Sequence, residues 1–166
     1  MKNKALILFQ LLFAFPVLSL TANAQNSDKI DLKPFQIFDV IDFSGEGSSE
    51  VFPGDKWEFF GPTRQVTVDE KQKILGAGTA VFGTSSGTSR IAISLCYAKK
   101  GTEAPVSFAE NNHLIADAGS LRHTFSVSAS VDLPAGKYAV GYCVNNRGPQ
   151  TLNNNDYVNG WVIIVK

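Results

Sequence analysis

The sequence predicts an all-β protein, an antiparallel β-sandwich or jelly roll of about eight or nine strands in a single domain. No stretch long enough for a helix repeats apolar side chains at helical spacing, whereas several segments alternate them with period two. Clusters of Gly, Pro, Ser and Asn separate these segments at intervals of roughly 8–12 residues. The 166 residues are also the length of about one domain.

Residues 1–24 are predicted to be a cleaved export signal. Lys2 and Lys4 form a short basic start, residues 5–20 are mostly apolar, and a small-x-small motif ends at Ala24. Residues 25–166 then form one β-sandwich domain that is periplasmic or extracellular. No second apolar run reaches the roughly 20 residues of a membrane span, so we expect no membrane insertion after cleavage.

The first half of the exported chain is predicted to supply five strands. Segments with β-branched and aromatic side chains occur at residues 35–43, 56–60, 64–68 and 73–82, and turn residues bound each of them. Residues 90–98 alternate more strictly. Their large apolar side chains, Ile91, Ile93 and Leu95, share one face, and smaller side chains share the other.

The second half supplies a short strand at residues 113–116 and longer strands at 122–131, 137–144 and 157–165. In residues 122–131, Phe125 and Val127 alternate with Ser and Thr, which predicts a half-buried strand with one hydroxyl-lined face in water. Both parities are apolar at the end of residues 157–165. This pattern predicts a central strand that is covered on both faces.

The charge balance excludes some partners. Lys and Arg together number 15, as do Asp and Glu, and the predicted signal removes two of the lysines. Nucleic acids and anionic membrane surfaces reward basic stripes. Neither is therefore predicted as a partner.

Cys96 and Cys143 are the only cysteines. Export would carry them to a compartment in which disulfides persist, so a Cys96–Cys143 bridge is predicted. The two strands that carry them either pair side by side or lie in facing sheets. A redox pair is disfavoured because it would need closer spacing, and a metal site would need more ligands.

No catalytic residue is predicted. Gly83-Thr-Ser-Ser-Gly87 matches a nucleophile-elbow string around Ser85, yet no helix follows it, so a hairpin loop is expected. His113 and His123 are the only histidines, and with Asp117 they would complete a three-ligand metal site or supply a base. A structural role for both is the preferred interpretation, and a small hydrolase is the least favoured function.

The polar loop at residues 145–156 is the first candidate for recognition, because long loops on rigid sandwiches often bind ligands. Asn153, Asn155 and Asp156 offer the oxygen ligands that calcium prefers, although Asn and Asp also favour turns. Calcium is therefore a weak candidate, and no other cofactor is expected. The acidic residues between Asp39 and Glu58 are interpreted as solvated loop charges.

Aromatic residues beside polar ones suggest sugar recognition. Trp57 lies near Gly61-Pro62, and Tyr157 and Trp161 bracket Asn159-Gly160. Sugar rings stack their C–H faces on aromatic rings while amides bond their hydroxyls. The alternative is that these aromatic residues belong to the core.

Residues 134–144, PAGKYAVGYCV, and 156–165, DYVNGWVIIV, resemble the last strands of C1q/TNF-type jelly rolls. The resemblance implies a trimeric, ligand-presenting jelly roll. The sequence observations taken together lead to two hypotheses. The preferred one is a secreted, non-catalytic domain that binds carbohydrate through Trp57, Tyr157 and Trp161 with the Asn-rich loop. The alternative is an oligomeric extracellular assembly protein with protein partners.

Overall fold

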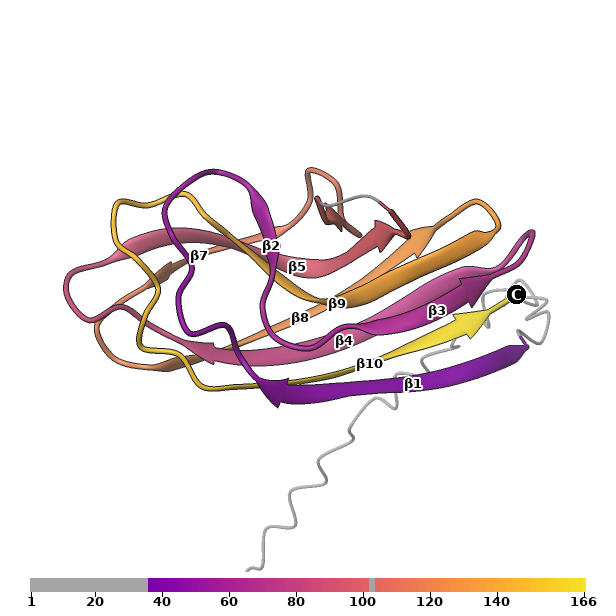
Figure 1. Ribbon diagram of the computed structural model, residues 1–166, viewed down its shortest axis with the longest axis horizontal. Coiled ribbons are helices and arrows are strands. Elements are labelled where there is room, and N and C mark those ends of the chain that lie inside the picture. Colours follow the sequence, from indigo (N-terminus) through magenta and orange to yellow (C-terminus); the bar gives the residue numbers. More distant parts are fainter. Residues whose placement is uncertain (1–35, 102–103) are drawn as a thin grey trace, which may run out of the picture. The chain divides into compact units, whose positions relative to one another are not determined.

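The strands of this protein form two antiparallel sheets (Figure 1). The computed structural model describes residues 36–101 and 104–166, and these ranges contain ten strands and no helix. The predicted export signal lies outside the described residues. Within them, no helix has the length and apolar character to cross a membrane.

The four-stranded sheet has the order β1-β10-β4-β8. Its members are β1 (Ile37–Glu46), β10 (Tyr157–Val165), β4 (Lys73–Phe82) and β8 (His123–Asp132). The six-stranded sheet has the order β2-β9-β5-β6, and β3 pairs with β9 while β7 pairs with β5. Its members are β2 (Trp57–Phe59), β9 (Gly136–Asn146), β5 (Ser89–Lys99), β6 (Val106–Ser107), β3 (Arg64–Val68) and β7 (Leu114–Ala118).

The all-β prediction is confirmed, and so are the nine predicted strands, with ends displaced by a few residues. The strand that the sequence did not reveal is β6. It has only two residues, too few for alternation to be recognised.

The core lies between the sheets and is built from the inward-facing side chains of both. Ile74 and Phe82 enter it from β4, and Ile93, Leu95 and Tyr142 enter it from β5 and β9. In each of these strands the side chains that face the core alternate with those that face away from it. The two sheets therefore form a sandwich around one contiguous set of apolar side chains.

The prediction for β8 is confirmed and that for β10 is wrong in part. In β8 the apolar side chains are part-buried and the Ser and Thr side chains are exposed. In β10 Val158 and Val162 are buried, whereas Tyr157 and Trp161 are exposed. β10 is central in its hydrogen bonding, between β1 and β4. The second face of β10 meets solvent at Tyr157 and Trp161, whereas Val165 at its end is buried.

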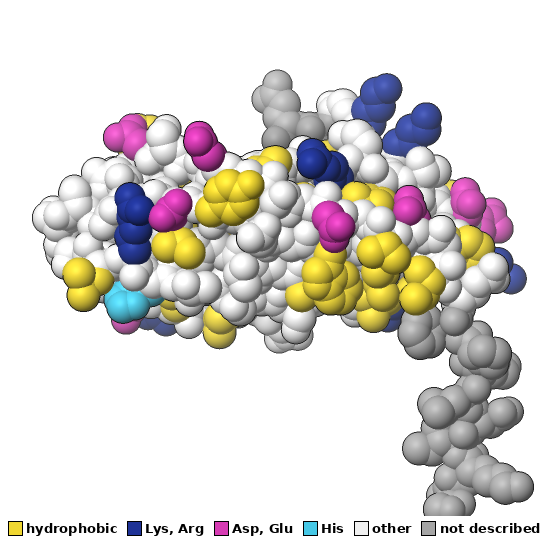
Figure 2. All heavy atoms as spheres, turned by 90° about the horizontal axis from the view of Figure 1, so that it is seen from below, with side chains coloured by type: hydrophobic (Ala, Val, Ile, Leu, Met, Phe, Trp, Pro, Cys, Tyr) yellow, Lys and Arg dark blue, Asp and Glu magenta, His cyan; other side chains and the backbone are white. Residues whose placement is uncertain are grey.

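β1 is an edge strand of the four-stranded sheet. Figure 2 looks at the side on which β1 lies and shows hydrophobic and acidic side chains gathered there. Ile37, Phe38 and Val40 are exposed. Two backbone groups of this edge are bonded to side chains. The Val40 N–H donates to Asp39 Oδ1 at 2.9 Å, and Arg64 Nε donates to the Asp42 carbonyl at 3.1 Å.

The predicted Cys96–Cys143 disulfide is present and joins β5 to β9 within the six-stranded sheet. The register pairs Cys96 with Gly141 and Ser94 with Cys143, so the bridge runs diagonally between neighbouring strands. The Cα atoms are 5.7 Å apart, and both cysteines are fully buried. Of the two arrangements that the sequence left open, the side-by-side one is found.

Tyr142 lies in the core, and burial raises the pKa of its hydroxyl well above its ordinary value of 10.0. The hydroxyl donates to the Phe125 carbonyl at 3.2 Å. Above about pH 10 the unfolded chain would release this proton while the folded chain keeps it, so stability is expected to fall as the pH rises. Urea unfolding of Tyr142→Phe at pH 9 and pH 11 should show a smaller pH dependence than unfolding of the wild type. An equal dependence would contradict this assignment.

Candidate functional site

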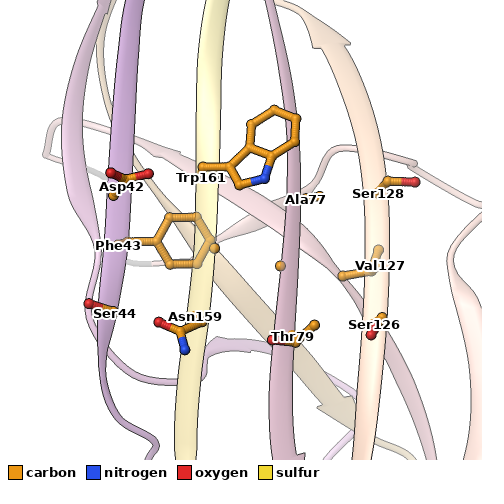
Figure 3. Close-up of a pocket in the computed structure, with 12 residues that line it drawn as sticks. Asp42, Phe43, Ser44, Ala77, Thr79, Ser126, Val127, Ser128, Asn159 and Trp161 are labelled. Atoms are coloured by element: carbon orange, nitrogen blue, oxygen red, sulfur yellow. The ribbon is translucent and has the colours of Figure 1, made fainter.

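The outer face of the four-stranded sheet carries a depression of about 690 Å³ (Figure 3). This volume lies within the range of small-ligand sites. All four strands contribute to it. The lining residues are Asp42, Phe43, Ser44, Ala77, Gly78, Thr79, Ser126, Val127, Ser128, Asn159, Gly160 and Trp161.

The strand register arranges the outward side chains in two rows. One row runs Asp42, Trp161, Ala77 and Ser128 across the sheet, and the next runs Ser44, Asn159, Thr79 and Ser126. In Figure 3 Asp42 lies at the β1 end of the first row and Ser128 at the β8 end. The rows are two residues apart along each strand, about 6.6 Å. The depression therefore crosses the strands.

Trp161 is the exposed aromatic side chain in this depression, with 42% of its surface exposed. Its neighbour in the row, Ala77, has a small side chain that leaves space beside the indole ring (Figure 3). Gly160 allows the Phe43 ring to pass beneath the sheet, because a Cβ on Gly160 would overlap that ring. Phe43 is thus fully buried below the site, and the indole remains above it.

Polar side chains surround Trp161. Six of them line the depression, and within the described part of the chain none of the six makes a side-chain hydrogen bond or an ion pair with the protein. Asp42 contributes only its backbone carbonyl to Arg64. Their polar atoms are therefore available to a ligand. They are the side chains of Asp42, Ser44, Thr79, Ser126, Ser128 and Asn159.

The three predicted aromatic residues do not form one cluster. Tyr157 lies in β10, as Trp161 does, is 48% exposed and shares its parity, so the two face the same side of the sheet. Trp57 lies in the other sheet, in β2, where its ring packs edge-on against His113 with centroids 5.3 Å apart. Of these three aromatic residues, only Trp161 lines the depression.

The predicted amides of the loop at residues 145–156 bond mainly to the protein itself. Asn153 Oδ1 accepts from the Ser85 N–H at 2.7 Å, and Asn153 Nδ2 donates to Ser85 Oγ at 3.2 Å. Asn155 Nδ2 donates to the Ser48 carbonyl at 2.8 Å. These bonds tie the loop to neighbouring loops, which is the turn and loop role that competed with recognition.

The calcium candidates lie around a second depression of about 330 Å³, with Glu46 nearby. Asp156 Oδ2 lies 2.9 Å from Arg122 Nη1, so its charge already has a cationic partner. Asn155 Oδ1 is buried without a hydrogen bond. No group of three or more His, Cys, Asp or Glu side chains suited to a metal occurs in the ranges that the structure describes. Calcium binding stays a prediction.

The residues considered for catalysis, Ser85, His113 and His123, contact other residues of the described chain and not one another. Ser85 bonds to Asn153, and His113 Nδ1 lies 3.0 Å from the Glu110 carbonyl. The ring of His123 is 6.5 Å from that of Phe125. Neither histidine is hydrogen-bonded to Ser85 among the described residues, and a structural role for both stays a prediction.

In the comparisons with known proteins, 14 solved chains match this chain in structure. No family model and no curated protein matches this chain. Among solved structures, the C-terminal CBM6, a carbohydrate-binding module, of LamC, a marine laminarinase from Zobellia galactanivorans, aligns with a TM-score of 0.32 and 11% identity. The alignment covers 77% of this chain and 100% of the other. A TM-score and an identity this low carry no argument about function, so the functional argument rests on the geometry of the site.

Proposed function

We propose that this protein is a secreted, non-catalytic β-sandwich domain that binds carbohydrate on the outer face of the four-stranded sheet. The observation that carries the proposal is an exposed indole, Trp161, in a shallow depression surrounded by six polar side chains that have no partner among the described residues. A sugar ring needs an aromatic face for its C–H groups and polar atoms for its hydroxyls. Both requirements are met here on rigid strands.

This proposal moves the binding face from the loop at residues 145–156 to the sheet. The loop amides bond to neighbouring loops, whereas the sheet hydroxyls have no partner within the described residues. Tyr157 shares the sheet face and extends it along β10. An assembly function with protein partners stays the alternative prediction.

The test is loss of binding in Trp161→Ala. We expect it to weaken binding of any polysaccharide that the wild type binds by at least tenfold, about 1.4 kcal/mol, because the stacking surface is removed. Isothermal titration calorimetry measures the affinity. The indole is exposed, so the urea unfolding midpoint is expected to stay close to that of the wild type.

Trp57→Phe is the matched control, because it changes the other tryptophan, in the other sheet. Its affinity should equal that of the wild type. Unchanged affinity in Trp161→Ala, or a flat response of the wild type across a broad polysaccharide panel, would contradict carbohydrate binding at this face.

A further inference from the structure

The depression is a groove that crosses the whole four-stranded sheet. Its two rows of side chains start on β1 and end on β8, and these are the two edge strands. Neighbouring strands lie about 4.8 Å apart, so the groove spans about 14 Å from edge to edge. Because an edge strand stands at each end, no further strand of this sheet closes either end. A chain molecule can therefore enter at one edge and leave at the other.

The groove is uncharged except for one carboxylate. Asp42 is the only acidic residue among its lining residues, and Lys, Arg and His are absent from them. Arg64 reaches the Asp42 backbone carbonyl and does not line the groove. Lys73, on the same sheet, is paired with Asp132 at 3.2 Å. Among the lining residues, an anionic ligand would thus meet the like charge of Asp42 and no cation.

Hydroxyl groups suit the remaining lining. The Asp42 carboxylate accepts hydrogen bonds, and the serine hydroxyls on β8 both donate and accept them. Charge-assisted bonds from ligand hydroxyls to Asp42 are stronger than neutral ones. The ligand that matches the groove therefore carries hydroxyls along its length and no negative charge.

On the basis of the proposed function, we propose that the groove binds an internal stretch of an uncharged polysaccharide, with the glycan chain lying across the strands. One sugar ring stacks on Trp161, and its neighbours bond to Asp42 at the β1 end and to Ser126 and Ser128 at the β8 end. The groove length fits about three sugar rings.

The experiment uses Trp57→Phe, in which Trp161 is the single tryptophan and its emission reports on the groove. Uncharged probes are hydroxyethyl cellulose, laminarin, xylan and galactomannan. Charged probes are carboxymethyl cellulose, alginate and polygalacturonate. We expect uncharged probes to bind at least tenfold tighter at low salt, with a smaller difference in 0.5 M NaCl, because salt screens the repulsion from Asp42.

Asp42→Asn in the same background removes the carboxylate, and we expect the preference over the carboxylated probes to shrink to less than threefold. Asp117→Asn, in β7 of the other sheet, is the matched control and should keep the wild-type preference. A preference that Asp42→Asn leaves unchanged would overturn the role of Asp42.

Oligosaccharides of the polysaccharide that binds, with two to six residues, then measure the length of the site. Affinity should rise to about three residues and level off, in keeping with the groove span. Borohydride reduction of the longer oligosaccharides should leave their affinity unchanged. Equal or tighter binding of charged probes, or a requirement for an intact chain end, would overturn this inference and leave carbohydrate binding intact. Absence of binding to every probe would overturn both proposals.

Discussion

Replacement of both Cys96 and Cys143 by Ala is expected to lower the free energy of unfolding by about 4 kcal/mol, because the bridge closes a loop of 47 residues. The bridge lowers the conformational entropy of the unfolded chain, and this loss is larger when the closed loop is longer. Total stabilities of domains this size are about 5–15 kcal/mol. Urea unfolding followed by far-UV circular dichroism would measure the change.

Reduction of the wild-type protein supplies the control for this double variant. Once the buried bridge is reduced, the protein should unfold at nearly the same urea concentration as the Ala variant. Any additional loss in the variant reflects the cavities that two buried sulfur atoms leave. A loss below about 1 kcal/mol would contradict the assignment. Glycan affinity of the folded fraction should persist, because the binding face belongs to the other sheet.

Replacement of Asn146 by Ala is expected to lower the free energy of unfolding by about 3 kcal/mol. Asn146 is 1% exposed at the end of β9. Its Oδ1 accepts from Ser89 Oγ at 2.7 Å and from the Gly148 N–H at 3.3 Å. Its Nδ2 donates to the Val51 carbonyl at 3.0 Å and the Gln150 carbonyl at 2.8 Å. The variant removes all four of these hydrogen bonds near the start of the polar loop, and the Val51 carbonyl and Ser89 Oγ keep only the bonds that they accept from the Leu152 and Gln150 N–H groups.

Asn145 is the matched control, because it is the preceding residue and is 2% exposed. It makes one side-chain hydrogen bond, from Nδ2 to Asp55 Oδ1 at 3.1 Å, and its Oδ1 has no partner in the described chain. Removing an unsatisfied buried group relieves a cost. Asn145→Ala is therefore expected to change stability by less than about 1 kcal/mol. Equal losses in the two variants would contradict the hydrogen-bond explanation and point to burial alone.

Most of the fold was predictable because sheet periodicity is local. The alternation at residues 122–131 predicted both the strand β8 and its wet face, and the presence of Cys96 and Cys143 as the only cysteines of a chain predicted to be exported predicted their bridge. For β10 the local pattern was misleading. Ile163 is apolar on the outer face, where Val40 and Leu75 flank it in the register. Side chains of three neighbouring strands thus form an apolar row on the outer face. In the sequence, this row gives β10 the same apolar pattern as a strand that a second layer covers.

The candidate site was predictable only in part, because it depends on strand order. Trp161 was identified in the sequence because it is an aromatic residue with polar residues beside it. Asp42 stands beside it only because β10 pairs with β1, and Ser128 joins the same row only because β4 pairs with both β10 and β8, contacts between distant parts of the chain. The hydroxyl-lined face of β8 was the one available signal. The Asn-rich loop was predicted as a recognition site in part because of its amide groups, but amide groups form turns and loop contacts as readily as they bind ligands.

The bonded backbone groups at the edge of β1 affect how molecules of this protein meet one another. A strand from a second molecule adds to an exposed edge through free N–H and C=O groups, and this is how edge strands start aggregates. The side chains of Asp39 and Arg64 already occupy one such donor and one such acceptor, at Val40 and Asp42. The apolar side chains of β1 are thus displayed beside a backbone that resists strand addition. For a protein with an open, partly apolar face, this protection is expected to help the molecules stay dispersed at high concentration.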